Sequence, residues 1–180
     1  MSDPDGVLDD ILGPGLRLVI CGTAAGTRSA ALKHYYSGQG NRFWDTLKDT
    51  GLIPDDFDPC QEEKLPERGI AIGLTDLAKM VSGGDKPLPP GCWNVAGFKE
   101  KLREHQPRVV AFNGKKAAKV CFHVKTVEYG EQPRSPEFPD IVFFVATSTS
   151  RQASGPWKAN PGAWRALADL VNATRDLPRE

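Results

Sequence analysis

The chain has 180 residues, enough for one domain with a substantial core and too few for two comfortable ones. Its 23 Lys and Arg residues balance its 23 Asp and Glu residues, so the net charge neither requires nor excludes a nucleic-acid partner. No apolar run approaches the roughly 20 residues that span a bilayer, and the first residues do not form a signal peptide. We predict a single domain over residues 1–180, in a soluble, cytoplasmic monomer without membrane contact.

The first predicted elements are a strand, a long loop and a helix. Residues 16–21 are apolar and predict a buried strand. Residues 41–51 predict a helix with Asn41 as its N-cap and Gly51 as its stop. The loop between them, residues 22–40, is longer than a simple connector. Because a Gly-rich loop at the end of a buried strand is where α/β proteins bind ligands, this loop is the first place to look for a site.

Strands and helices alternate through the rest of the chain. Further strands are predicted at residues 69–77, 108–112, 124–129 and 141–146. Helices are predicted at 95–105 and 114–121, and a last helix is opened by Asn160 as cap and Pro161 as first residue. Residues 54–68, 82–91 and 132–140 are rich in turn residues. This order predicts the α/β class: a three-layer α/β/α fold with a central, mostly parallel sheet of about four strands.

The four cysteines contain no CxxC pair. Cys21 and Cys121 lie in or beside apolar segments, which favours buried free thiols over a metal site, a cluster or a disulfide. The sequence therefore predicts no metal and no organic cofactor.

Four segments, in order and with compatible spacing, resemble those of one family. The residues leading to Gly22-Thr-Ala-Ala-Gly26 are similar to an opening strand and a G-I-N-P-G loop, and residues 40–45, Gly-Asn-Arg-Phe-Trp-Asp, to an A-N-R-F-W helix start. Residues 111–115 are similar to an F-N-G-K segment, and residues 145–151 to an M-P-S-S-S-A-R loop. The family is the uracil-DNA glycosylase superfamily, and the branch is that of the mismatch-specific uracil and thymine glycosylases. The resemblance covers most of residues 9–170.

The resemblance implies a DNA-repair enzyme that hydrolyses the N-glycosidic bond of uracil, with other deaminated bases as further candidates, and leaves an abasic site. Such an enzyme flips the base out of the helix, holds it in a pocket and stabilises a cationic sugar while water attacks. The partner is then DNA that contains uracil or abasic sites, and a bacterial protein would associate with the nucleoid. A monofunctional mechanism follows, since residues 22–26 contain no lysine.

The main departure from the family lies at Ala24. The branch has at this position the Asn that positions the attacking water, and Ala25 replaces the following Pro. Because alanine cannot orient or deprotonate water, either another residue activates it or little general-base help is needed. The candidate is Asp76, as general base or as electrostatic stabiliser of the sugar cation, although an Asp there can also be a simple cap or turn residue. A third outcome is a protein that binds uracil or abasic DNA without cleaving it.

The resemblance also assigns a base-binding set: Gly22, Thr23, Ala24, Tyr36 and Asn113. Tyr36 falls where the branch keeps an aromatic ring that stacks on the flipped base, a contact worth roughly 1–3 kcal/mol. Thr23 would read the pyrimidine edge, and Asn113, at a strand end, would pair with O4 and N3–H of uracil. The alternatives are a core or surface tyrosine and a turn asparagine.

DNA binding is predicted for the loop after the last strand, at Thr147, Ser148, Thr149, Ser150 and Arg151. Hydroxyl groups there would hold the flanking phosphates, and Arg151 would fill the space that the base leaves. Lys115 begins a basic run with Lys116, Lys119 and Lys125, which is either a phosphate-facing patch or a solvated helix face.

Two weaker hypotheses stay open. His34 is a general acid, a phosphate contact or neither. The chain as a whole is alternatively an unrelated α/β enzyme whose loop at residues 22–26 cradles the phosphate of a small nucleotide. That loop lacks the Lys of a P-loop and the spacing of a dinucleotide fingerprint.

Overall fold

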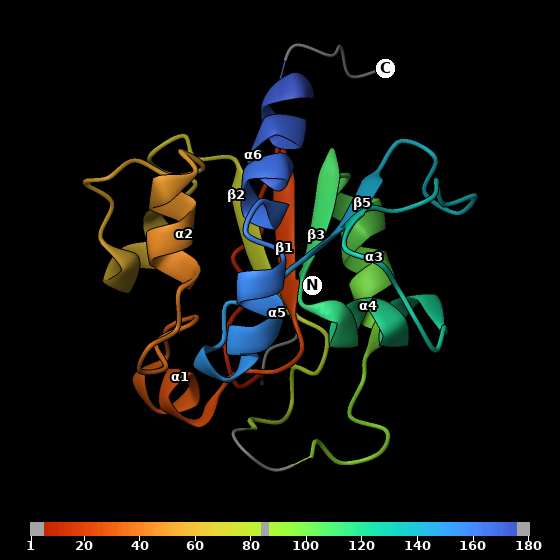
Figure 1. Ribbon diagram of the computed structural model, residues 1–180, viewed down its shortest axis with the longest axis horizontal. Coiled ribbons are helices and arrows are strands. Elements are labelled where there is room, and N and C mark those ends of the chain that lie inside the picture. The colour runs from red at the N-terminus through yellow and green to blue at the C-terminus, as the bar shows by residue number, and fades with distance from the viewer. Residues whose placement is uncertain (1–5, 84–86, 176–180) are drawn as a thin grey trace.

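The computed structural model describes residues 6–83 and 87–175, and it places a five-stranded sheet at the centre (Figure 1). The strands follow the order β2-β1-β3-β5-β4. Their bounds are β1 (Leu18–Gly22), β2 (Ile72–Asp76), β3 (Val109–Asn113), β4 (Gly130–Glu131) and β5 (Val142–Ala146). The neighbours among β2, β1, β3 and β5 pair in parallel, whereas β4 pairs antiparallel with β5. The predicted α/β class and mostly parallel sheet are confirmed.

Helices cover both faces of the sheet (Figure 1). They are α1 (Thr27–Leu32), α2 (Phe43–Asp49), α3 (Val95–His105), α4 (Lys115–Phe122), α5 (Ser154–Ala159) and α6 (Ala163–Ala173). Two short 3₁₀ helices, η1 (Pro59–Lys64) and η2 (Arg151–Ala153), complete the set for the described residues. With α3 and α4 on one face and α2 and α6 on the other, the molecule has the predicted three layers.

The alternation of side chains along each strand builds two cores. Successive strand residues point to opposite faces of a sheet. On one face Ile20 packs in a cluster with Phe43 of α2 and Trp164 of α6. On the other face its neighbour Val19 packs in a cluster with Phe98 of α3. Because these strands are buried on both faces, they appear in the sequence as continuous apolar runs.

The strand predicted at residues 124–129 is wrong. These residues form no strand, Val124 is 43% exposed, and the short edge strand β4 lies just beyond them. The edge of β5 is instead paired by Gly130 and Glu131. Val127 is instead buried in the cluster that contains Phe98 and Phe143, and the pairing with β5 begins only at Gly130.

Helix positions also differ from the prediction in three places. The loop predicted at residues 22–40 contains α1, which the run of small and polar residues concealed. Helix α2 begins at Phe43, whose N–H donates to the Asn41 side chain at 3.0 Å. Helix α6 begins at Ala163, and Asn160 and Pro161 precede it, because the separate helix α5 ends just before them.

The cysteines are all free thiols, and Cys21 and Cys121 are buried as predicted, whereas Cys60 is exposed. Among the described residues, no helix combines the length and apolar character needed to cross a membrane.

Candidate active site

A pocket of about 400 Å³ lies where β1, β2 and β3 end, at the carboxyl edge of the sheet. This is the edge at which open α/β sheets bind ligands, and the volume suits a small molecule. The pocket gathers most of the residues that the sequence singled out: Gly22, Thr23, Ala24, Tyr36, Asp76, Asn113, Ser148, Thr149, Ser150 and Arg151. Thr147 and Lys115 do not line it.

Several lining residues had no signal in the sequence. They include Leu8, Ser29, Tyr35, Gln39 and Gln152. Leu8 belongs to the amino-terminal segment, which pairs with the edge strand β2 through an antiparallel bridge between Ile11 and Leu74. Local sequence patterns cannot reveal this pairing, because it joins residues that lie far apart in the chain.

Gly22 and Asp76 are register partners at the ends of β1 and β2. A Cβ atom placed on Gly22 would lie 2.4 Å from Oδ1 of Asp76 and 3.1 Å from the hydroxyl oxygen of Tyr36. Real Cβ atoms essentially never lie as close as 2.4 Å to another heavy atom. Glycine at position 22 therefore makes the space in which the carboxylate and the phenol face the pocket.

Asp76 is a buried carboxyl group, with only 5% of its surface exposed. Burial raises its pKa to about 7, against the opposing effect of Lys79. Asp10 raises this pKa further, and Lys101 lowers it. A pKa near neutrality suits a general base, so this buried carboxyl group in the pocket is a candidate for that role.

A buried ion-pair network centred on Asp10 stands behind Asp76. Oδ1 of Asp10 lies 2.8 Å from Nζ of Lys79 and accepts a hydrogen bond from Thr75 at 2.7 Å. Oδ2 of Asp10 lies 2.6 Å from Nζ of Lys101. Burial alone would raise the pKa of Asp10, but Lys79, Lys101 and Thr75 outweigh it and lower that pKa. The network places a fixed positive charge near Asp76 and satisfies a buried carboxylate on both oxygens.

Lys79 also ties the pocket wall together. Its ammonium group donates to the carbonyl of Leu8 and, at 3.3 Å, to the hydroxyl of Tyr35. The backbone of Val7 in turn donates to the carbonyl of Lys79 at 2.8 Å. The amino-terminal segment and the residues after β2 therefore form one unit around a buried lysine.

The ring of Tyr36 stacks on Phe43, with ring centroids 3.7 Å apart and planes inclined by 24°. Tyr36 has a φ of 55°, in the left-handed region that non-glycine residues rarely adopt. Its hydroxyl is buried and has no hydrogen-bond partner among the described residues. Burial and the nearby Asp76 raise the pKa of Tyr36 well above its ordinary value, so the phenol keeps its proton.

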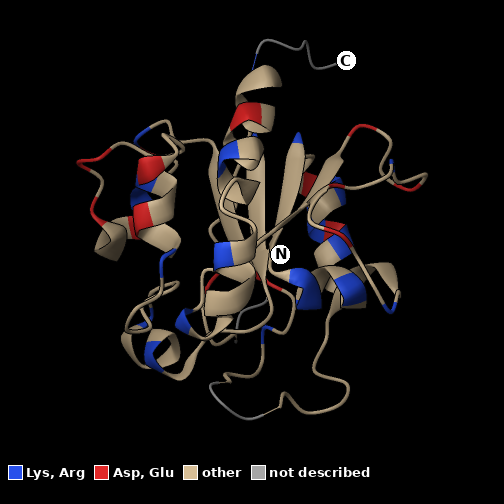
Figure 2. Ribbon diagram, viewed as in Figure 1, with Lys and Arg blue, Asp and Glu red and all other residues tan. Residues whose placement is uncertain are grey.

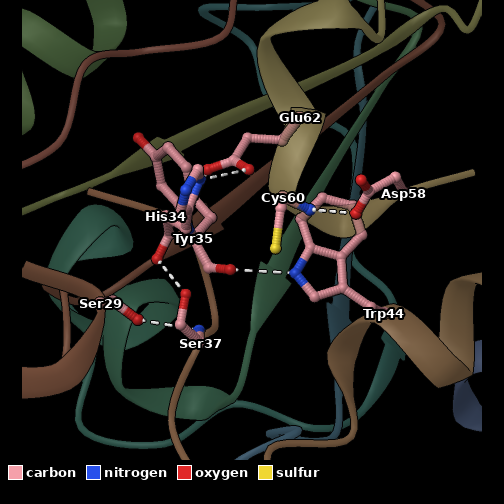
Figure 3. A network of polar contacts seen from close by, with 8 residues as sticks. All are labelled: Ser29, His34, Tyr35, Ser37, Trp44, Asp58, Cys60 and Glu62. Carbon is pink, nitrogen blue, oxygen red and sulfur yellow. Dashed lines mark hydrogen bonds and ion pairs between the residues drawn. The ribbon is translucent and has the colours of Figure 1, made fainter. Parts of the chain in front are cut away.

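A polar network holds the loop that carries this ring (Figure 3). The carboxylate of Glu62, from η1, accepts from the backbone N–H of Tyr35 at 2.9 Å and lies 3.0 Å from Nδ1 of His34. The indole N–H of Trp44 donates to the carbonyl of Tyr35, and the hydroxyl of Ser37 donates to the carbonyl of His34. His34 thus pairs with Glu62 and is not among the lining residues of the pocket. These contacts supply the packing that an unusual backbone conformation requires.

The loop after β5 is joined to β3 and α2. The N–H of Thr149 donates to Oδ1 of Asn113 at 3.0 Å, and Nδ2 of Asn113 donates to the Thr149 hydroxyl at 2.9 Å. Arg42 donates to the carbonyl of Ser150, and the indole of Trp164 donates to the carbonyl of Thr147. Thr147 and Thr149 are buried, whereas Ser148, Ser150 and Arg151 remain at the pocket.

Lys and Arg positions are marked in the ribbon on α1, α4 and α5 (Figure 2). Asp and Glu positions are marked on α2 and the segment that leads to η1, and also on α3, on α6 and on the loops beside β4 and β5 (Figure 2). Lys115 at the start of α4 lies 4.4 Å from the ring centroid of Tyr129 and 3.8 Å from Glu128. Over residues 6–83 and 87–175, no group of three or more His, Cys, Asp or Glu side chains is placed to hold a metal ion.

Comparison with known proteins agrees with this architecture. The fold is similar to a solution NMR structure from Methanosarcina acetivorans that carries the provisional name uracil DNA glycosylase, with a TM-score of 0.57 and 20% sequence identity. The similarity covers 96% of this chain and 99% of that one. The family profile of the Uracil DNA glycosylase superfamily matches residues 10–170. The chain belongs to the Uracil DNA glycosylase superfamily.

Proposed function

We propose that the protein is a monofunctional uracil-DNA glycosylase in which Asp76 takes the role of the missing water-positioning residue. The observation that carries this proposal is the buried carboxyl group at the end of β2, next to a loop that offers only Thr23, Ala24 and Ala25 as side chains. Membership of the superfamily supports a glycosylase that acts on DNA. Uracil is the proposed base, with other deaminated bases as further candidates.

The reaction divides among groups that the pocket brings together. A flipped base stacks on Tyr36, whose own ring is fixed by Phe43. The ionised carboxylate of Asp76 accepts a proton from water as the water oxygen attacks the anomeric carbon. The carbon–nitrogen bond breaks and the base leaves with the bonding electrons. The same negative charge stabilises the cationic sugar in the transition state.

DNA itself is held outside the pocket. Ser148, Ser150 and Arg151 face the pocket mouth, where hydroxyl and guanidinium groups bind phosphates or fill the place of the flipped base. Lys115 adds positive charge beside that loop, whereas the buried Thr147 and Thr149 contribute by fixing its shape. The proposed partner is DNA with uracil or abasic sites, bound by a monomer.

The test is excision from oligonucleotides that carry one uracil, in single and double strands, read as alkali-labile cleavage. The wild-type protein cleaves, and Asp76→Asn loses about 10²- to 10⁴-fold in single-turnover rate while it retains DNA binding, because a general base contributes in that range. The exposed Asp169→Asn on α6 is the matched control and excises at the wild-type rate. Unchanged excision by Asp76→Asn removes this carboxyl from the mechanism.

A non-catalytic binder of uracil or abasic DNA is the second candidate, and Ala24 favours it. Fluorescence anisotropy with abasic and undamaged duplexes separates the two. Tight binding to the abasic duplex without cleavage of any uracil substrate would establish the binder and end the enzyme proposal.

A further inference from the structure

The Tyr36 hydroxyl is the one buried side-chain polar atom without a hydrogen-bond partner among the described residues. An unpaired buried hydroxyl costs roughly 1–3 kcal/mol, so such groups call for an explanation. The stack on Phe43 fixes the ring and, with it, the position of the oxygen. Base stacking requires only the ring, and the hydroxyl therefore has a separate role to explain.

The geometry around Gly22 indicates that the Tyr36 hydroxyl lies near the Asp76 carboxylate. One point, the position of a Cβ on Gly22, lies 3.1 Å from the Tyr36 oxygen and 2.4 Å from Oδ1 of Asp76. The two oxygens are thus separated by no more than the sum of these distances. Hydrogen bonds in unliganded active sites are often long and tighten when substrate binds. A small movement of the carboxylate, in space that only glycine leaves open, brings the two groups into contact.

The direction of the hydrogen bond follows from the neighbours. Asn113, the other polar group close to the phenol, acts to lower the pKa of Tyr36. Its amide oxygen already accepts from the N–H of Thr149, which leaves an amide N–H as its contribution. Toward the Tyr36 oxygen Asn113 can therefore act only as a donor, which leaves the phenol proton free to go to the carboxylate. A charge-assisted O–H···O⁻ bond of this kind is short and strong.

We propose that Tyr36 is a positioning residue for Asp76: its hydroxyl donates a hydrogen bond to the ionised carboxylate and holds it toward the attacking water. This inference rests on the proposed function, in which Asp76 accepts the proton of that water. The phenol keeps its own proton throughout, so proton transfer runs from water to Asp76 only. The network Thr149–Asn113–Tyr36–Asp76 then connects the DNA-contacting loop to the carboxylate.

The charged groups that act on Asp76 set the background for a pH test. Lys79 and Lys101 lower its pKa, and Asp10 raises it. The other titratable groups that interact with it are neutral near pH 7, because their pKa values are raised: Cys21, Tyr35 and Tyr36. Removal of the Tyr36 hydroxyl changes none of these charges, so a shift in the pH profile reports the lost hydrogen bond.

Tyr36→Phe tests the inference because it deletes one oxygen and keeps the stacking ring. We expect kcat for uracil excision to fall about ten- to hundredfold, the loss expected for a hydrogen bond to a charged group, with KM within about twofold. The acidic limb of the pH–rate profile moves to higher pH, because the ionised carboxylate loses a donor. Tyr129→Phe, which removes a hydroxyl outside the pocket, is the matched control and changes neither quantity.

A second measurement does not depend on activity. Carbon-13 NMR of the Asp76 carboxyl group gives its pKa in the folded wild type and in Tyr36→Phe, and the inference requires a higher value in the variant. An equal carboxyl pKa, or a reduced kcat with an unmoved acidic limb, overturns the inference. If Asp76→Asn slows excision and Tyr36→Phe does not, only this inference fails. If Asp76→Asn leaves excision unchanged, the proposed function fails, even where NMR detects the contact.

Discussion

The ends of the two neighbouring strands β1 and β2 differ more than any other pair of segments at the pocket. The β1 end, residues 22–26, offers the pocket no ionisable group, whereas the β2 end, residues 76–79, carries a buried carboxylate and a buried ammonium group. Two backbone hydrogen bonds join them, from Leu77 to the carbonyl of Gly22 and from Ala78 to that of Thr23. The two strand ends are therefore joined, although only the β2 end carries ionisable side chains.

This contrast teaches that the small residues of the β1 end have a function of their own. Gly22 leaves room for the Asp76 carboxylate, which any larger residue would occupy. The proposed catalytic group at the end of β2 therefore depends on the absence of a side chain at the end of β1. The following predictions break or sharpen this contrast, from the largest expected effect to the smallest.

The largest effect is expected for Gly22→Ala. The added methyl group would lie 2.4 Å from Oδ1 of Asp76, so the carboxylate must move in a packed environment. We expect a loss of at least about 10²-fold in excision rate, close to that of Asp76→Asn. Gly13→Ala is the control, because its Cβ meets no atom within 4 Å. Wild-type excision by Gly22→Ala would show that the space at Gly22 is not needed.

A change in stability is expected for Asp76→Asn. The folded-state pKa of about 7 exceeds the ordinary value of 3.8, so the native state binds this proton more tightly than the unfolded state. The stability that this bound proton contributes is fully present below pH 3.8 and is lost as the pH rises from 3.8 to about 7. The neutral variant avoids this loss. We therefore expect its free energy of unfolding at about pH 8 to exceed that of the wild type by a few kcal/mol.

Urea unfolding at several pH values measures this effect. The gain should disappear below about pH 4, where the wild-type carboxyl group is protonated as well. A variant that is less stable than the wild type at about pH 8 would show that the ionised carboxylate, once formed, is stabilised by Lys79 more than burial penalises it.

A smaller effect is expected for Lys79→Met. Lys79 lowers the pKa of Asp76, so its loss moves the acidic limb of the pH–rate profile upward, by about one pH unit. The variant also leaves Asp10 with Lys101 as its remaining cation and is less stable. Comparison with Lys64→Met, at an exposed position of η1 outside the pocket, separates the local effect from a general loss of charge. An unmoved limb would remove Lys79 from the control of Asp76.

The smallest effect is expected for Ala24→Asn, which gives the β1 end the asparagine of the resembling G-I-N-P-G loop. Because the proposed mechanism assigns the water to Asp76, the excision rate should change by less than about threefold. A tenfold or greater increase in single-turnover rate would place the limiting deficiency at the β1 end. The same substitution in an Asp76→Asn background shows whether the two ends can replace one another.

The sequence predicted the layers well because they depend on local patterns. Continuous apolar runs at β1, β3 and β5 are typical of buried parallel strands, and the helix over Val95–His105 was predicted with its observed bounds. The strand expected at residues 124–129 was wrong because a run of strand-forming residues does not show where the chain meets its partner, and the pairing with β5 begins only at Gly130. Helix α1 was missed because six residues of small and polar character give little periodic signal.

Many residues of the candidate site were predicted from the sequence, whereas the contacts between them were not. Asp76 and Asn113 stand out because each ends an apolar strand, and parallel strands end at one edge. The contact between Asp10 and Lys79 has no sequence signal, because these residues meet only through the pairing of the amino-terminal segment with β2. The same holds for the Tyr36 hydroxyl, whose burial depends on a left-handed backbone and a stacked phenylalanine.

The Asp10 network has a consequence for how the protein is made. Asp10 leaves the ribosome early, but its hydrogen-bond partner Thr75 follows 65 positions later, and the bond from Lys79 to Leu8 spans 71 positions. Contacts of such separation form slowly and only after the intervening chain exists. During synthesis the contacts of Asp10 and Leu8 cannot form until the residues that follow β2 have been translated. Arg151, which also lines the pocket, is translated later. The pocket is therefore complete only after the residues that follow β5 have been made.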